Sequence, residues 1–250
     1  MKHVLNSTLV LITSMLLSPL SAEVLETWTF SEADGTTIDG TSSDKGTLLS
    51  TVSRSTAAVK KGRMEFFPDG ETDGVFLINA FAQGPVSSGV YEVSWTYTSA
   101  AFANTLEVDG SANIGFDFRD TKETRYKGND DGLLGGVRLR YEKKHILIQY
   151  SAAGDANRFT TVASIDRIVL PDPLSVRIRY DLDNSGKPGS MQIFLQLGEE
   201  DEINPVTDAE IPEGTVLSGY RILQQITNGK TNWQKGDVVS IDDFTLSKVE

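Results

Sequence analysis

The chain has 250 residues, of which 39% are hydrophobic, a net charge of −12 and no Cys. This hydrophobic content is too high for a solvated disordered chain, and the absence of Cys excludes disulfides, thiolate metal sites and a Cys nucleophile. The acidic balance argues against a nucleic-acid partner, because affinity for nucleic acid comes mainly from Lys and Arg on phosphates.

The first 22 residues have the layout of a secretory signal peptide. Lys2 precedes an apolar stretch from Val4 to Leu17, Pro19 breaks it, and Ala22 offers a small residue at the cut. The stretch is shorter than the roughly 20 apolar residues that a spanning helix needs. We therefore expect a secreted or periplasmic protein that begins at Glu23 and has no membrane span. Cleavage removes Lys2 and leaves 22 basic against 35 acidic residues, a net charge of −13.

Strands are predicted along the whole mature chain, because polar and apolar residues alternate throughout it. In chain order the predicted strands are 25–30, 63–67, 74–79, 90–98, 112–119, 137–142, 145–150, 159–165, 174–182, 191–197, 216–226 and 238–249. Clusters of Gly, Asn, Asp and Pro separate these strands. The acidic segment 199–213, which contains Pro205 and Pro212, is predicted to be a loop. We predict one all-β domain over residues 23–250, an antiparallel two-sheet β-sandwich of the jelly-roll type.

Two tryptophans differ in their predicted surroundings. Trp95 shares its parity with Tyr91, Val93 and Tyr97, so it is assigned to the core rather than to a sugar-stacking surface. Trp233 lies in a polar loop between two predicted strands. An aromatic ring on such a loop could stack on a sugar, or it could close the end of the sandwich, and both interpretations stay open.

The segment from Gly135 to Ser151 is the most informative, because it reads as a hairpin turning at Lys143 and Lys144. A loop of two or four residues pairs Arg138 with Gln149, Arg140 with Leu147 and Glu142 with His145. These six side chains then share one face. The opposite face holds an apolar set that is typical of a core: Val137, Leu139, Tyr141, Ile146, Ile148 and Tyr150.

The polar face of this hairpin is the candidate site. His145 is the only His of the mature chain and can act as base or acid near neutral pH. Arg138 and Arg140 can hold a carboxylate or sulfate through paired hydrogen bonds. We assign His145, Arg138, Arg140 and Gln149 as candidate catalytic residues. The candidate ligand-binding residues are Arg119, Glu142 and Trp233.

Charge supports this choice, because Arg119 to Lys144 contains eight basic and five acidic residues within an acidic chain. Such a basic island can concentrate an anionic ligand locally. The alternative is an ordinary solvated strand face, on which cross-strand ion pairs stabilise the sheet modestly.

Metal-binding patterns are weak. The segment Asp181 to Gly186 copies the start of a Ca²⁺ loop, but its twelfth position is Gln192 rather than a bidentate acid, and the flanking strands favour a hairpin turn. The segments 129–132 and 242–243 offer further oxygens for Ca²⁺. We predict no cofactor and no metal-ligating residues, and Ca²⁺ is the one ion for which the sequence offers oxygen ligands.

Three segments resemble concanavalin A-like, or laminin G-like, jelly-roll domains. These are Trp28 to Thr36 near the mature start, Val239 to Leu246 near the end, and Tyr180 to Asp183 followed by a glycine turn and the strand from Met191. The resemblance implies two curved antiparallel sheets, often with carbohydrate on the concave face. This superfamily includes lectin-like modules, glycoside hydrolases and polysaccharide lyases.

Two enzyme subgroups can be compared with this chain. Laminarinase-like hydrolases carry Glu-x-Asp-x-x-Glu on a strand, whereas the nearest string here, Glu199 to Asn204, lacks the last Glu. Alginate-lyase-like members use Arg, Gln, His and Tyr on the concave sheet. The hairpin offers Arg, Gln and His in another order, and no Tyr on the same face.

Two functions follow from different classes. The preferred one is a secreted, monomeric carbohydrate-binding β-sandwich that recognises a polysaccharide, with an anionic glycan suited to the basic island. The alternative is a polysaccharide-active enzyme, a lyase acting on an acidic glycan. In that enzyme Arg138 and Arg140 would neutralise the uronate carboxylate with help from Gln149, and His145 would abstract the C5 proton.

Overall fold

The computed structural model describes residues 22–37, 50–51, 57–66, 76–81, 83–101, 111–119, 133–142, 145–152, 159–166, 169–182, 188–226 and 238–249. At 50–51, 76–80, 111–117, 119, 133 and 221–226 only the backbone is described. Almost all of the predicted signal peptide therefore lies outside the described residues. Within them no helix is long and apolar enough to cross a membrane.

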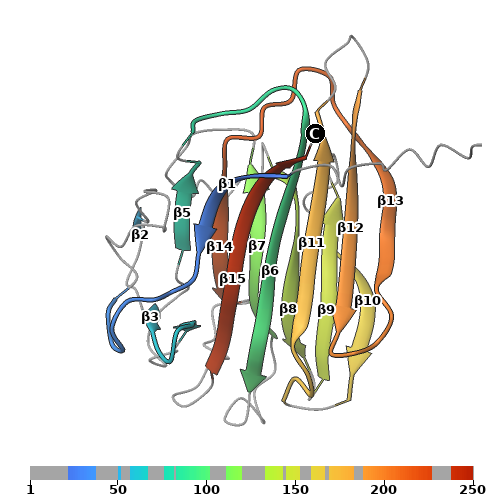
Figure 1. The fold of residues 1–250 in the computed structure, drawn as a ribbon. Helices are drawn as coiled ribbons and strands as arrows, with labels where there is room; N and C mark the ends of the chain where they lie inside the picture. Colours follow the sequence, from blue (N-terminus) through green and yellow to red (C-terminus); the bar gives the residue numbers. More distant parts are fainter. Residues whose placement is uncertain are drawn as a thin grey trace, which may run out of the picture.

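Two antiparallel sheets stack face to face (Figure 1). Sheet 1 has the order β13 (Ile203–Ile211), β12 (Gly189–Leu197), β11 (Leu174–Asp181), β6 (Val90–Ala101), β15 (Val238–Val249), β4 (Met64–Phe66) and β3 (Ala57–Val59), and β1 (Glu23–Trp28) pairs with β15. Sheet 2 has the order β10 (Thr160–Ile165), β9 (His145–Ala152), β8 (Leu133–Glu142), β7 (Ser111–Arg119), β14 (Gly219–Ile226), β5 (Phe76–Ala80) and β2 (Ser50–Thr51). The predicted all-β sandwich is confirmed.

Each predicted strand overlaps an observed one, but the predicted loop at 199–213 is wrong. Strand β13 occupies most of it and pairs with β12 at the edge of sheet 1. An edge strand tolerates Pro205 because the missing N–H faces no partner strand. Val206 and Ile211 are buried while acidic residues between them are exposed, and such charges protect an edge from pairing with another chain.

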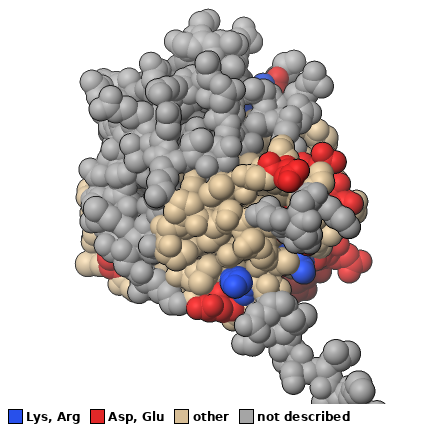
Figure 2. All heavy atoms as spheres, turned by 90° about the horizontal axis from the view of Figure 1, so that it is seen from above, with Lys and Arg blue, Asp and Glu red and all other residues tan. Residues whose placement is uncertain are grey.

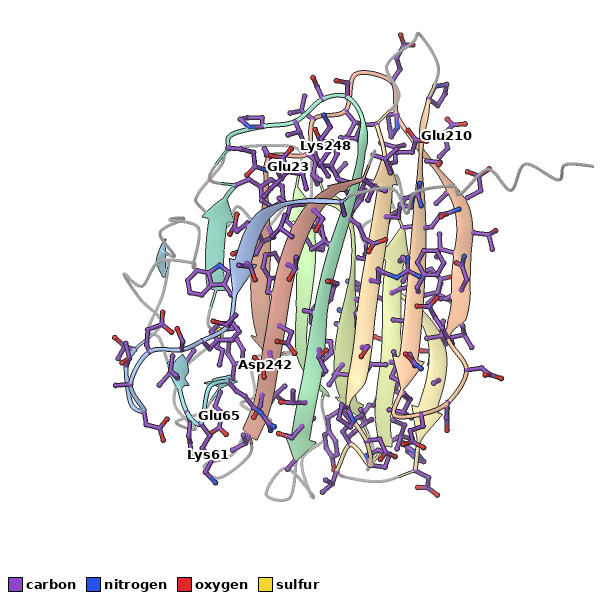
Figure 3. All side chains as sticks on the ribbon, in the orientation of Figure 1. Glu23, Lys61, Glu65, Glu210, Asp242 and Lys248 are labelled. Carbon is purple, nitrogen blue, oxygen red and sulfur yellow. The ribbon has the colours of Figure 1, made fainter. Side chains whose placement is uncertain are left out.

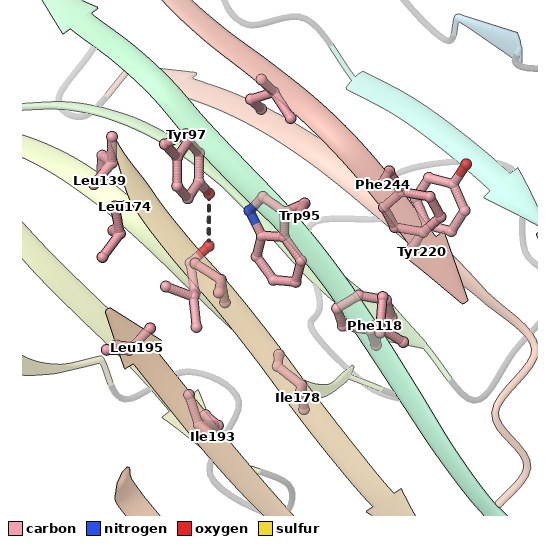
Figure 4. Packing of buried hydrophobic residues seen from close by; sticks show 14 of the residues in the cluster. Trp95, Tyr97, Phe118, Leu139, Leu174, Ile178, Ile193, Leu195, Tyr220 and Phe244 are labelled. Atoms are coloured by element: carbon pink, nitrogen blue, oxygen red, sulfur yellow. Dashed lines mark hydrogen bonds between the residues drawn. The ribbon is translucent and has the colours of Figure 1, made fainter. Parts of the chain in front are cut away.

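The core consists of the inward-facing side chains of both sheets. Trp95 is buried, as predicted, and its ring lies 5.9 Å from that of Phe118 on the other sheet. The rings of Tyr220 and Phe244 continue this packing with centroids 4.6 Å apart (Figure 4). The Tyr97 hydroxyl donates to the Val137 carbonyl across the sandwich, at 3.0 Å. Burying one large apolar side chain contributes about 1.5–3 kcal/mol, so this packing can stabilise a chain without disulfides.

The two sheets come very close at Gly135, near the start of β8. Its φ is +103°, and a Cβ there would lie 2.6 Å from Cε of Met191 on β12 and 2.7 Å from the Ser151 carbonyl on β9. Only glycine meets both the backbone angle and the spacing.

We predict that Gly135→Ala lowers the free energy of unfolding by roughly 2–4 kcal/mol, because it combines backbone strain with overpacking. Gly84→Ala is the matched control, since Gly84 has a φ of +85° but open space for 4 Å around the position that a Cβ would take. Urea unfolding of both variants separates the contributions. Equal losses in the two variants would contradict a close approach at Gly135.

A buried carboxylate on the first strand, β1, connects the two sheets. Glu26 on β1 is fully buried, and its Oε1 accepts hydrogen bonds from Trp28 Nε1 at 3.3 Å and from the Tyr220 hydroxyl at 3.2 Å. Tyr220 belongs to sheet 2. A buried charge is costly unless it is hydrogen-bonded, so these donors are needed to keep Glu26 in the core.

Glu26→Leu is expected to lower the free energy of unfolding by about 1–3 kcal/mol, since two buried donors lose their acceptor. Glu26→Gln keeps an acceptor oxygen and should lose less. Thermal or urea unfolding at neutral pH measures the difference. A leucine variant as stable as the glutamine variant would show that the acceptor contributes nothing.

Candidate functional site

The hairpin of β8 and β9 has the predicted register. Arg138 pairs with Gln149, Arg140 with Leu147 and Glu142 with His145. The predicted core face is also confirmed, because Val137, Leu139, Tyr141, Ile146 and Ile148 are buried and Tyr150 is half-buried. Alternation along both strands then places the polar set on the outer face of sheet 2. The turn residues Lys143 and Lys144 lie outside the described residues.

Arg138 is held by neighbours from two strands. Its Nε donates to Gln149 Oε1 at 2.9 Å, and Gln149 Nε2 donates onward to Thr161 Oγ1 on β10 at 3.0 Å. Its guanidinium carbon lies 3.4 Å from the ring centroid of Phe159. Gln149 is only 7% exposed, so the amide that orients this cation is fixed by packing. The result is a planar cation stacked on an aromatic ring.

Arg140 has an acidic neighbour on its own strand. Its Nε lies 3.0 Å from Glu142 Oε2, and both side chains are largely shielded from solvent, with 25% and 33% exposed. An anionic ligand at Arg140 must therefore compete with Glu142. The two arginines of the predicted site thus differ, since Arg138 is oriented by a neutral amide and an aromatic ring.

His145 lies at the turn end of the hairpin and is open to solvent, with 41% of its side chain exposed. Its Nδ1 is 3.5 Å from Oδ1 of Asp166, the residue after β10. The carboxylate lies beside the ring, but Nδ1 makes no hydrogen bond to the described residues. His145 is therefore an accessible imidazole with an acidic neighbour at the end of the hairpin.

The structure spreads the predicted site along the strands. Arg138 and Glu142 are four residues apart on β8, which corresponds to about 13 Å of strand. His145 is opposite Glu142, so it lies at that distance from the paired Arg138 and Gln149. Arg119 pairs with Leu133 at the far end of β8. Its side chain, Trp233 and the basic residues at 122–127 lie outside the described parts of the structure.

Three residues that complete this face were not predicted. Phe159, Thr161 and Asp166 come from β10 and its flanks, and they contact Arg138, Gln149 and His145 respectively. The sequence did indicate a strand at 159–165. It did not indicate that this strand pairs with β9, because the neighbours of a strand in a sheet depend on the whole topology.

Charge and metal ligands complete the description. Seen from one end of the sandwich, Asp and Glu gather along the border of the described surface (Figure 2), in line with the net charge of −12.

Nowhere among the described residues do three or more His, Asp or Glu side chains gather as they would around a metal ion. Of the segments with oxygens for Ca²⁺, 129–132 lies outside the described residues. Asp181 ends β11 and pairs with Ser190 of β12, the predicted hairpin arrangement.

Comparison with known proteins shows the fold. No family model and no curated protein matches the sequence. Alginate lyase Aly36B is similar in structure, with a TM-score of 0.56 and 14% identity over 93% of this chain and 100% of that one. A mutant of the same lyase in complex with alginate trisaccharide has a TM-score of 0.53 and 15% identity over 81% and 88% of the two chains. The carbohydrate recognition domain of Emp47p has a TM-score of 0.53 and 11% identity over 92% and 97%. The chain therefore has the concanavalin A-like jelly-roll fold, as the sequence motifs predicted.

Gln149→Leu should lower the free energy of unfolding by about 1–3 kcal/mol, because leucine keeps the packing but removes both hydrogen bonds of the amide. Thr161→Val removes one of the two bonds, at an exposed position, and should cost less. Urea denaturation gives both values. A loss as large in Thr161→Val as in Gln149→Leu would show that the contact to Arg138 adds no stability.

Proposed function

We propose that this protein is a secreted carbohydrate-binding β-sandwich that recognises an acidic polysaccharide on the hairpin face, the outer surface of β8, β9 and β10. The observation that carries this proposal is the fixed position of Arg138 between Gln149 and Phe159. A cation that is already ordered loses little conformational entropy when a ligand binds. Stacking on the Phe159 ring helps to hold the plane of the guanidinium in place.

The kinds of protein that share the fold support the ligand class. One similar structure holds an alginate trisaccharide, and another is a carbohydrate recognition domain. Fold alone does not fix function, so the choice of an acidic glycan rests on this chain. Two arginines lie on the hairpin face, and the segment from Arg119 to Lys144 has three more basic than acidic residues.

A lyase is the second candidate, and the contact of His145 with Asp166 is the observation that favours it. His145 would take the C5 proton of a uronate while the C4–O bond breaks, which leaves a C4–C5 double bond and a departing sugar oxygen that gains a proton. Arg140 is the nearer arginine to this end of the hairpin. Arg138 and Gln149 lie about 13 Å away along the strand at the level of the backbone, so the four residues are spread over the face rather than gathered around one sugar. This separation favours binding over elimination.

Binding to alginate, polygalacturonate and a neutral glucan tests the proposal. Arg138→Ala should weaken binding of the acidic polymers by roughly 10- to 100-fold, the equivalent of one charge-assisted contact. Arg140→Ala should weaken it less, since Glu142 already balances that charge. The matched control is Arg179→Ala on β11 of sheet 1, which removes the same charge from the opposite side of the sandwich and should leave binding unchanged. Unaltered affinity in Arg138→Ala would show that the hairpin face is the wrong surface.

The same samples test the lyase alternative. Absorbance of an unsaturated product is followed with the wild type and with His145→Ala. Product formation that disappears in His145→Ala would replace the binding proposal with the lyase. Binding without product, equal in both proteins, agrees with a binding protein.

A further inference from the structure

The outer face of sheet 1, on the far side of the sandwich from the hairpin face, carries a hollow of about 220 Å³. Its lining includes Ser94 and Thr96 on β6 and Ser175 on β11. Trp95, between Ser94 and Thr96, and Val176, next to Ser175, are buried in the core. Because side chains alternate along a strand, the three hydroxyl side chains point outward. We name this feature the sheet-1 hollow.

Arg177 lines the sheet-1 hollow and is tightly held. Its Nη1 donates to Glu92 at 3.0 Å, and its Nη2 donates to both carboxylate oxygens of Glu202 at 2.8 and 3.1 Å. Its guanidinium carbon lies 3.8 Å from the ring centroid of Phe194. Burial would lower the pKa of Arg177, but the hydrogen bonds and charges of the two glutamates outweigh it and raise that pKa.

The charge balance of the hollow is therefore acidic. Its lining includes one cation, Arg177, and two carboxylates, Glu202 and Asp243, and Glu92 outside the lining also pairs with Arg177. Such a surface repels carboxylates and sulfates. Its carboxylate acceptors instead suit a ligand that brings hydrogen-bond donors.

Asp243 is presented to the hollow by a bulge in β15. The register between β15 and β6 shifts from Asp242 to Thr245, and Asp243 has a φ of +56°, which is unusual for a residue with a side chain. Its N–H donates to Asp242 Oδ1 at 2.9 Å, which holds the bulge in place. Figure 3 labels Asp242 on β15. Strained residues of this kind cluster at ligand sites, where they re-aim a side chain.

The dimensions restrict the ligand further. Sites for drug-sized molecules commonly measure about 300–1,000 Å³, so this hollow holds one ring rather than a stretch of polymer. Hydroxyl groups around a ring would meet the carboxylates of Asp243 and Glu202 as acceptors, and the Ser and Thr hydroxyls can both donate and accept. We propose that the sheet-1 hollow binds a single neutral sugar ring, so that the two outer faces of the protein differ in specificity.

Calorimetric titration with cellotetraose, mannotetraose and laminaritetraose tests this site. Asp243→Gly removes the carboxylate while relieving the backbone strain, so it should fold at least as well as the wild type. It should weaken binding of a neutral oligosaccharide about tenfold, the effect of a ~1.4 kcal/mol contact. Glu210→Gln on β13 is the control, because it removes an exposed acidic charge outside the lining of the hollow.

The two sites can be told apart by their variants. Arg138→Ala should leave binding of neutral sugars unchanged, and Asp243→Gly should leave binding of acidic polymers unchanged. Neutral-sugar binding that is absent in the wild type, or equally strong in Asp243→Gly, would overturn the proposal. Glucosamine that binds through Asp243 while neutral sugars do not would identify a cation site instead, and would also overturn it.

Discussion

The packing of one face of each sheet against the other is the constraint on which this structure depends. No Cys is present to cross-link the chain, so Trp95, Phe118, Tyr220 and their neighbours must fill the space between the sheets. Every second residue of a strand is committed to this task. The residues between them form the two outer surfaces, on which both proposed sites lie.

The same constraint explains what the sequence could predict. Alternation is a local property, so the β8–β9 register, the core side of each strand and the pairing of Arg138 with Gln149 followed from the chain itself. Strand β13 did not, because Pro205 and the acidic residues indicate a loop unless the strand is known to lie at an edge. The neighbours Phe159 and Asp166 were missed because they reach the hairpin through pairing of β10 with β9, which no local pattern encodes.

Two arginines illustrate how surroundings decide chemistry. Arg138 and Arg177 both lie over a phenylalanine ring at similar distances, 3.4 and 3.8 Å. Arg138 is oriented by a neutral amide, whereas Arg177 is clamped by two carboxylates, one from β6 and one from the residue before β13. The proposed preference for an acidic ligand on one face and a neutral one on the other rests on this difference. The alternating strands around them look alike in sequence, since the partners that differ come from distant segments.

Strand β15 has a consequence for how the molecule reaches its folded state. It lies between β6 and β4, pairing Val238 with Ala101 and Ile241 with Met64, and β1 also pairs with it. Without this strand, sheet 1 would fall into the four strands β13 to β6, the pair of β4 and β3, and the separate strand β1. Contacts between such distant segments slow folding, because a long loop must close before any of them forms. A chain cut before Val238 would therefore leave the edges of β6 and β4 unpaired in place of one continuous sheet, and unpaired edges favour aggregation.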